Sequence, residues 1–283
     1  MNDANELRTG VTALKMAYER EKPNLTDEEQ RQLESIGLLH DSAVYNSFLV
    51  SASEDHDLLT LWRFYGNAQV AYSLGFDRDV PLMPREQVRG HAHPSPPPDY
   101  RDYDWMLVDA RRQKIGPDPD SCRVMGGRWK VVTYVNRDGE HSHTEYIRSR
   151  LEKLQSDMAV QMWLEFGGNE DNPFNFEQIN LEKDSGFMDE REVRILVDLN
   201  PDWKFVKFRE TQFGLVPYIE LTTSAAADDR GFVPVDADCR LPICHIVVGP
   251  TGNAEAAKYA LRLFLDNAGY GDVTIGSSEI PFR

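Results

Sequence analysis

The apolar runs in this sequence are only as long as single β-strands, and this limits the folds open to the chain. A clear example is 243–248 (ICHIVV), which leads through the turn sequence GPTGN into a helical pattern that stops at Gly269. A membrane-spanning helix needs about 20 consecutive apolar residues, so we expect none. A chain of 283 residues can bury a full core. The sequence therefore predicts a globular protein built from short strands and helices.

Helical and strand-like patterns are mixed along the chain. Helical patterns occur at about 3–20, 26–37, 57–65, 144–166 and 254–269. Alternating or β-branched patterns occur at 46–53, 70–76, 105–110, 128–135, 192–199, 203–209, 216–222, 243–248 and 272–277. The three-residue connection 200–202 (NPD) predicts that the strands on either side of it pair antiparallel. We therefore expect an α+β fold with mixed, mostly antiparallel sheets flanked by helices.

The domain organisation is expected to be simple. The segment at about 91–104 contains four prolines, which cannot donate backbone hydrogen bonds and favour extended geometry. Strand patterns resume on both sides of it, and the sequence contains no repeat or coiled coil. We therefore predict one domain over 1–283 with a proline-rich surface excursion.

Charge and cysteine content exclude several classes of protein. The chain has 47 acidic and 31 basic residues, a formal net charge of −16, which disfavours general nucleic-acid binding or an anionic membrane surface. Three cysteines without a CxxC motif, behind a polar N-terminus that does not resemble a signal peptide, predict a reducing, cytoplasmic location. The histidine pairs His91/His93 and His141/His143 lie in polar, turn-like sequence, and the cysteines lack the close pairing of structural zinc sites, so we expect no metal.

The first candidate site is the charged start of the strand at 192–199. Period-two geometry places Glu190, Glu192 and Arg194 on one face, opposite an apolar face. Two carboxylates and a guanidinium could bind a polar substrate, with a glutamate as a base or as a stabiliser of positive charge. The alternative is the solvated face of a half-exposed strand whose charges pair with one another.

The second candidate is the sequence LWRFYG at 61–66. Trp62 and Tyr65 could stack on a planar ring, and Arg63 could hold a phosphate or carboxylate. The alternative is a core helix whose aromatic residues pack inward. The turn GPTGN at 249–253 could likewise hold an anion at a helix start, but it lacks the phosphate lysine of a P-loop, so a glycine-dependent tight turn is the simpler interpretation.

Five stretches, in order along nearly the whole chain, together resemble the bacterial domain-of-unknown-function family 2971. They are the start MNDANE; Ser47-Phe48 with 61–66 and 74–76; Phe187, Glu190, Glu192 and Arg194; Arg209 with Pro217-Tyr218; and 246–250 with the ending SSEIPFR at 277–283. Members usually carry a strand and a helix before the first of these stretches, whereas this sequence begins inside it. We therefore expect that the family's N-terminal strand and helix are missing here.

The resemblance implies a function. Members of the family resemble components of mobile or phage-defence gene sets, and their pattern is loosely similar to ADP-ribosyltransferases, which grip NAD with a split β-sheet, an aromatic stack and a glutamate on a late strand. Carried over by position, the catalytic residues are Glu192, Tyr65 and Glu190, with Tyr65 stacking on nicotinamide. The NAD-binding residues are Trp62, Arg63, Ser47 (or the neighbouring strand hydroxyl Ser51), Arg194, Arg209, Ser278 and Arg283.

Two hypotheses follow from the sequence. The first is an NAD-consuming enzyme of ADP-ribosyltransferase-like type, acting as a phage-defence or toxin-like effector, in which Glu192→Gln abolishes turnover with little change in stability. The second is a non-catalytic sensor or protein-interaction module, in which the charged strand is a structural ion-pair network. Convergence of Arg63, Arg194 and Arg283 on Glu192 in one concavity would favour the enzyme. A metal hydrolase using the histidine pairs is a weaker third option.

Overall fold

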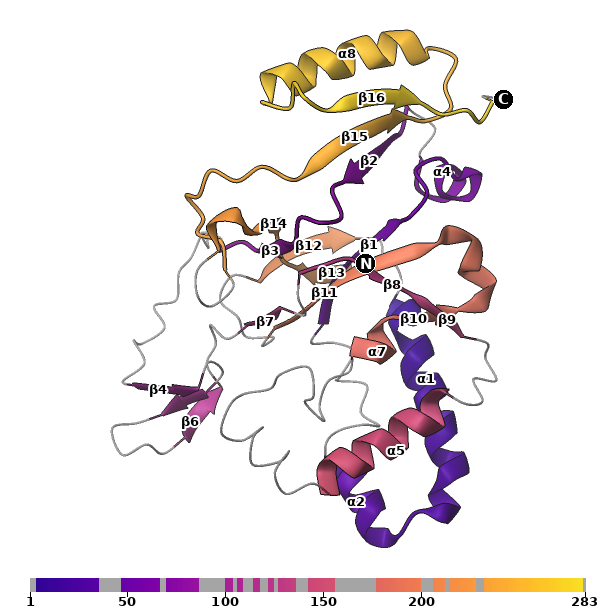
Figure 1. The fold of residues 1–283 in the computed structure, drawn as a ribbon, viewed down its shortest axis with the longest axis vertical. Helices are drawn as coiled ribbons and strands as arrows, with labels where there is room; N and C mark the ends of the chain where they lie inside the picture. Colours follow the sequence, from indigo (N-terminus) through magenta and orange to yellow (C-terminus); the bar gives the residue numbers. More distant parts are fainter. Residues whose placement is uncertain are drawn as a thin grey trace.

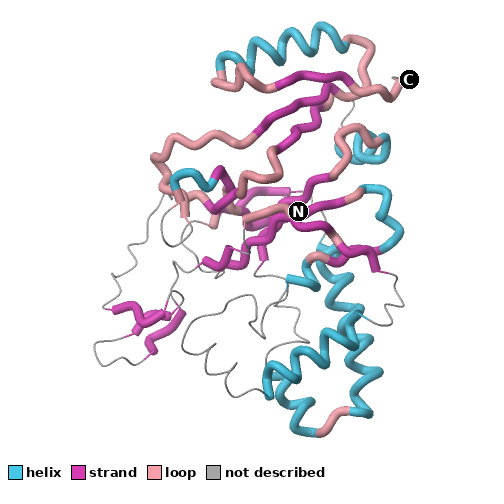
Figure 2. Tube along the Cα trace, viewed as in Figure 1, coloured by secondary structure: helices cyan, strands magenta, loops and turns pink. Residues whose placement is uncertain are grey.

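A computed structural model gives the fold, which is α+β as predicted (Figures 1 and 2). The structure describes residues 4–35, 47–66, 70–86, 100–103, 106–108, 114–117, 122–124, 127–135, 142–155, 177–199, 206–211, 214–227 and 232–281. Its sheets are small, and most of their strand pairs are antiparallel. Within these residues, no helix combines the length and apolar character that crossing a membrane would require.

The central sheet is organised around β11 (Glu192–Leu199). Along one side it pairs antiparallel with β1 (Ser47–Ser53), and along the other with β7 (Cys122–Val124) and β8 (Lys130–Val131). Ile195 and Val197 of β11 are fully buried in a core cluster. This apolar face is the one that the alternating sequence pattern predicts. β1 is left at the edge of the sheet.

A helical layer lies below the central sheet in Figure 1. It contains α1 (Ala4–Glu21), α2 (Asp27–Ser35), α5 (Ser142–Gln155) and the short α7 (Glu177–Asn180). Their apolar stripes meet in a core made by Val11, Leu14, Ala17, Tyr18, Leu33, Tyr146, Ile147, Leu151 and Ile179. Thr26 and Glu29 form a capping box at the start of the helix expected at 26–37, with each backbone N–H donating to the other's side chain. The parallel pair β9 (Thr133–Val135) and β10 (Glu182–Asp184) lies beside α1.

A second sheet lies above the central one in Figure 1. β15 (Ile243–Val248) pairs parallel with β16 (Thr274–Ser277) and antiparallel with β2 (Tyr72–Phe76). Helix α8 (Ala254–Asn267) covers one face, where Ile246 contacts Leu265 and Val273 in a small core. The short helix α4 (Leu59–Tyr65) connects β1 to β2 along the chain, so it joins the two sheets at their edges.

The remaining elements form small pairs. β3 (Leu82–Pro84) pairs with β14 (Leu221–Thr223), β12 (Lys207–Thr211) with β13 (Gly214–Tyr218), and β4 (Tyr100–Tyr103), β5 (Met106–Val108) and β6 (Lys114–Pro117) form a three-stranded sheet. Short 3₁₀ helices lie at Lys22–Asn24, Ser185–Glu190 and Ser224–Ala226. Most of the proline-rich segment lies outside the described residues, and its end forms β4.

Three sequence-based predictions were wrong in detail. The strand expected at 216–222 is divided into β13 and β14, which belong to different sheets. Residues 203–205 of the strand expected at 203–209 lie outside the described residues. The described strand, β12, begins at Lys207 and pairs with β13, not with β11, because β1, β7 and β8 already occupy both edges of β11. The strand expected at 128–135 is divided into β8 and β9, with Val132 buried between them. Half of the helix expected at 144–166 is seen as α5, and the rest lies outside the described residues.

Candidate functional site

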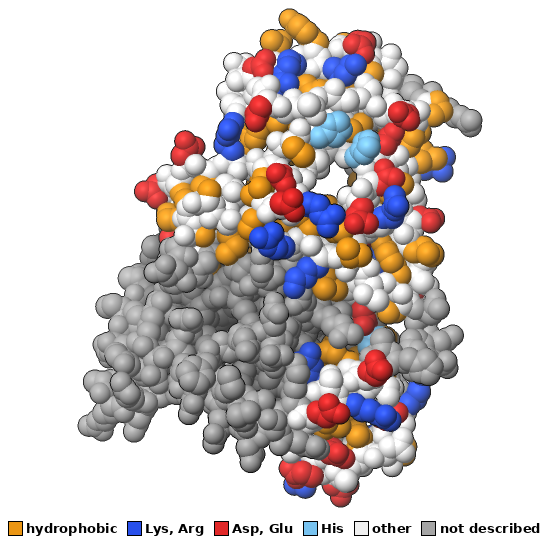
Figure 3. Space-filling model, in the orientation of Figure 1, with side chains coloured by type: hydrophobic (Ala, Val, Ile, Leu, Met, Phe, Trp, Pro, Cys, Tyr) orange, Lys and Arg blue, Asp and Glu red, His pale blue; other side chains and the backbone are white. Residues whose placement is uncertain are grey.

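Two neighbouring cavities open beside β1. The larger has a volume of about 650 Å³ and the smaller about 320 Å³, and they share a wall formed by Val50–Ser53, Leu61 and Tyr65. The larger cavity is also lined by Ala71 and by all of β2, so it lies between the facing edge strands of the two sheets. Figure 3 shows a hollow at this level, with histidine side chains near its rim.

The smaller cavity contains a cluster of buried charges. The ammonium nitrogen of Lys183 lies 2.7 Å from Glu190 Oε2 and 2.6 Å from Glu192 Oε2. These three residues line the cavity together with Leu49, Ser51 and Tyr65. Charged side chains are rarely this buried without a partner, and here each carboxylate has one. The cluster therefore presents a fixed arrangement of opposite charges to the cavity.

Arg194 contacts this cluster without lining the cavity. Its Nε donates to Glu192 Oε1 at 2.6 Å and one terminal nitrogen donates to the carbonyl of Asn180 at 2.7 Å. Arg194 is fully buried and does not line either cavity. Its position shows that it holds Glu192 in place.

The surroundings of Glu192 favour its anionic form. Burial acts to raise the pKa of this carboxyl, but hydrogen bonds from Arg194, Lys183 and Ser51, with the positive charge of Arg194, outweigh burial and lower the pKa. Glu192 is therefore a carboxylate at neutral pH. A second buried pair, His143 Nε2 and Glu182 Oε2 at 2.6 Å, lies on the neighbouring elements α5 and β10.

The predicted catalytic residues come together at the smaller cavity. Tyr65, Glu190 and Glu192 all line it, as does Ser51, although they lie on four separate elements: α4, the 3₁₀ helix at 185–190, β11 and β1. Ser47 begins β1 opposite Asp198, whereas Ser53 lies opposite Glu192. At about 3.3 Å per residue, Ser47 is roughly 20 Å from the Glu192 end of the strand, so Ser51 is the strand hydroxyl of this site.

The predicted cofactor-binding residues are more scattered. Arg63 is exposed on α4 and Arg209 on β12, where it lies 5.8 Å from the Tyr218 ring centre, and neither lines a cavity. Arg283 lies outside the described residues. The expected convergence of arginines on one concavity is therefore not seen among the described residues: Arg194 contacts Glu192 but is buried and lines neither cavity.

Trp62 and Ser278 have a structural role around Asp57. Asp57 Oδ1 accepts hydrogen bonds from Trp62 Nε1 at 2.7 Å and Ser278 Oγ at 2.5 Å, and Oδ2 accepts one from the backbone of Glu279 at 2.7 Å. Burial raises the pKa of Asp57, but these hydrogen bonds and the charge of His56 lower it overall. Trp62 also lines the larger cavity. These hydrogen bonds hold the start of α4 against the residues that follow β16.

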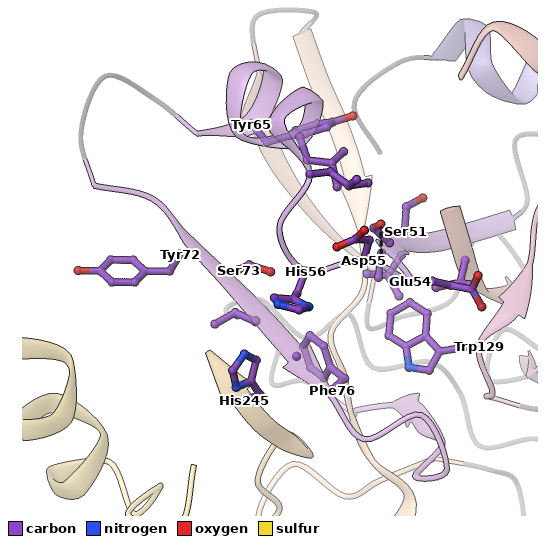
Figure 4. A pocket seen from close by; sticks show the side chains of 18 of the residues that line it. Ser51, Glu54, Asp55, His56, Tyr65, Tyr72, Ser73, Phe76, Trp129 and His245 are labelled. Carbon is purple, nitrogen blue, oxygen red and sulfur yellow. Dashed lines mark hydrogen bonds between the residues drawn. The ribbon is translucent and has the colours of Figure 1, made fainter. Parts of the chain in front are cut away.

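The larger cavity contains residues that the sequence did not single out as a group. Phe76 and Trp129 are 6.0 Å apart between ring centres, and His56 meets His245 edge-on at 5.6 Å (Figure 4). Tyr72, Ser73 and Arg78 complete this set. Aromatic and imidazole rings around a concave space are typical of a ligand-binding site.

Sequence reasoning missed Lys183 and this larger cavity for physical reasons. Lys183 lies in the sequence Glu-Lys-Asp, which is typical of an exposed surface. It is buried only because β10 packs against α1 and β9. His245 is the one signal that was available, because it interrupts the apolar strand 243–248. His245 lies on β15 between β2 and β16, and the face of this sheet that lines the cavity could not be deduced before the strand order was known.

The histidine and cysteine residues do not assemble into a metal site in the described part of the chain. His91, His93 and His141 lie outside that part, and His143 is bonded to Glu182. Among described residues, no three His, Cys, Asp or Glu side chains are grouped to hold a metal ion.

Comparison with known proteins yields no relative. No protein-family model, curated protein sequence or solved structure matches this chain. Neither the resemblance to family 2971 nor the NAD chemistry that it implies draws support from a homologue, so the chemistry of the site is argued from its own residues.

Proposed function

We propose that this protein is a cytoplasmic member of family 2971 that binds NAD and transfers or releases its ADP-ribose, acting as a defence or toxin-like effector. One observation carries the proposal. Tyr65, Ser51 and Glu192, the aromatic residue, strand hydroxyl and late-strand glutamate named by the resemblance, line a single cavity. They come from separate elements, so their meeting is a property of the fold.

The charges of the smaller cavity suit this chemistry. Breaking the bond between ribose C1′ and the nicotinamide nitrogen leaves the electron pair on nitrogen, so neutral nicotinamide departs and positive charge develops on the ribose. A fixed carboxylate stabilises such a charge. Water or an acceptor hydroxyl then adds at C1′ and loses its proton to solvent. Glu192 would serve as that carboxylate, and Tyr65 would stack on the nicotinamide ring.

The burial of Glu192 changes what its substitution tests. In Glu192→Gln, the positive charges of Lys183 and Arg194 would face only Glu190 in a buried cluster, and losing one partner of a buried ion pair costs about 3–5 kcal/mol. The variant should therefore lose turnover and also melt earlier, contrary to the sequence-based expectation of unchanged stability. Nicotinamide release from NAD by the wild-type chain, measured by chromatography, is the primary test, and Glu192→Gln should release none at a temperature where it remains folded.

A non-catalytic sensor is the second candidate, and one observation favours it. Both carboxylate oxygens of Glu192 already accept hydrogen bonds from cations, Oε1 from Arg194 and Oε2 from Lys183. A structural ion-pair network has this arrangement. The sensor predicts an NAD-dependent thermal shift without nicotinamide release, whereas the enzyme predicts both.

A further inference from the structure

His245 lies in the larger cavity with one ring nitrogen committed to the protein. Its Nδ1 is 2.9 Å from Thr274 Oγ1, and that hydroxyl lies 3.2 Å from the carbonyl oxygen of Cys244. The carbonyl can only accept, so the hydroxyl hydrogen of Thr274 goes to it and Thr274 Oγ1 accepts the proton on Nδ1. This chain of bonds places a proton on Nδ1, so the neutral imidazole keeps its acceptor lone pair on Nε2.

Glycines on both neighbouring strands keep the imidazole open. Gly75 lies opposite His245 on β2, and a Cβ there would come within 3.2 Å of His245 Cβ. On β16, a Cβ at Gly276 would lie 3.3 Å from His245 Cε1 and 3.7 Å from Nε2. A side chain at Gly276 would crowd the ring, and one at Gly75 would press on the Cβ and the carbonyl oxygen of His245. Within the described residues, Nε2 has no hydrogen-bond partner in the protein.

The rest of the cavity indicates the class of ligand. Phe76 and Trp129 supply flat apolar walls suited to a heteroaromatic base. Arg78 is the only lysine or arginine among the described residues that line this cavity, and guanidinium groups bind phosphate well. Glu54 and Asp55 line it too, and their carboxylates can accept hydrogen bonds from ribose hydroxyls but not hold the phosphate. A ring that donates a hydrogen bond to His245 and carries a phosphate matches these three features together.

We propose that the larger cavity binds a purine nucleoside 5′-monophosphate unit, with its exocyclic amino group donating to His245 Nε2 and its phosphate near Arg78. The inference rests on the proposed function, because adenosine monophosphate is one half of NAD and the nicotinamide half would reach the adjoining smaller cavity. Thr274 is a positioning residue that sets the tautomer of His245 without touching the ligand.

The test pairs two substitutions at Thr274. Thr274→Val keeps the shape but removes the hydroxyl, and Thr274→Ser keeps the hydroxyl. Calorimetric titration with adenosine 5′-monophosphate should show binding to the wild type, a loss of about tenfold in Thr274→Val, as expected for one hydrogen bond, and a change of less than about twofold in Thr274→Ser. Purine riboside 5′-monophosphate, which lacks the amino group, should bind the wild type about tenfold more weakly.

Nitrogen-15 spectra of histidine-labelled protein give a readout that a purely structural role would not move. His245 should show a protonated Nδ1 and an unprotonated Nε2 in the wild type and Thr274→Ser, and a changed pattern in Thr274→Val. An Nε2–H tautomer in the wild type, no binding of adenosine monophosphate, or equal binding by both variants would overturn the inference. If only Thr274→Val loses affinity for adenosine monophosphate and no protein releases nicotinamide, the binding site is retained and the enzyme is rejected. If nicotinamide is released but both variants bind adenosine monophosphate equally, the enzyme is retained and this inference is rejected.

Discussion

Lys183 Nζ lies 2.6 Å from Glu192 Oε2, and both side chains are almost completely buried. The same ammonium group also contacts Glu190 at 2.7 Å, so one cation joins the two carboxylates of the smaller cavity. Without it, the two carboxylates would face each other in a largely buried site. This relationship makes the site both a candidate for chemistry and a determinant of stability.

Lys183→Met should therefore destabilise the protein strongly. We expect a loss of about 3–5 kcal/mol in the free energy of unfolding, because the two glutamates lose their shared partner. Lys207→Met is the matched control, since Lys207 pairs with Glu220 at 2.7 Å but both are partly exposed, and its loss should be below about 1 kcal/mol. Urea unfolding measures both, and equal losses would show that the buried cluster is not special.

The lowered pKa of Glu192 predicts how stability depends on pH. A carboxyl whose pKa is lower in the folded protein than in the unfolded chain stabilises the fold at pH values above the pKa of the unfolded chain, which for glutamate is ordinarily near 4.5. This stabilisation is lost as the pH falls through the pKa of the folded state. The difference in unfolding free energy between wild type and Glu192→Gln should therefore be large at pH 7 and shrink below about pH 4.5. A difference that stays constant down to pH 3 would contradict the assignment.

Asp57 should be a second point of sensitivity, because it receives three hydrogen bonds from two distant parts of the chain. Asp57→Asn removes the charge and turns an amide donor toward one of these donors. We expect a loss of about 2–3 kcal/mol, typical of hydrogen bonds to a charged group. Asp79→Asn on an exposed turn should change the unfolding free energy by less than about 0.5 kcal/mol in the same assay. A comparable effect of both changes would exclude the role of Asp57.

Gly249 should tolerate no side chain. A Cβ there would lie 2.9 Å from Trp62 Cζ3 and 3.2 Å from the carbonyl oxygen of Ala71, so Gly249→Ala should cost about 1–3 kcal/mol by overpacking. Gly271→Ala, whose Cβ would meet only Asp266 Oδ1 at 3.5 Å, is the control and should be nearly neutral. Thermal melting of the two variants tests this directly. Equal melting temperatures would mean that the ring of Trp62 moves aside freely.

The secondary structure was largely predictable where local patterns are strong. The capping box at Thr26, the strand at 243–248 and the helix that ends before Gly269 are all seen, because caps, β-branched runs and a positive-φ glycine act over a few residues. Strand pairing was less predictable. The partner of the strand beginning at Lys207 depends on which edges are already filled, and this is a property of the whole fold.

The site was predictable in part for the same reason. Period two correctly placed Glu192 and Arg194 on one face, but it indicated a half-exposed strand, whereas both side chains are buried. The helical layer and β10 cover this face, and the ammonium group of Lys183 on β10 neutralises the charge of Glu192. Long-range packing of this kind leaves no local pattern at the residues that it buries.

The most direct test of the central claim is nicotinamide release by Tyr65→Ala beside Phe64→Ala. Both side chains are largely exposed neighbours on α4, but only Tyr65 lines the cavities, so neither change should alter the melting temperature by more than a few degrees. The account predicts that the wild type and Phe64→Ala release nicotinamide from NAD at similar rates, while Tyr65→Ala is at least about tenfold slower through loss of ring stacking. Equal rates in all three proteins, or no release by any of them, would contradict it.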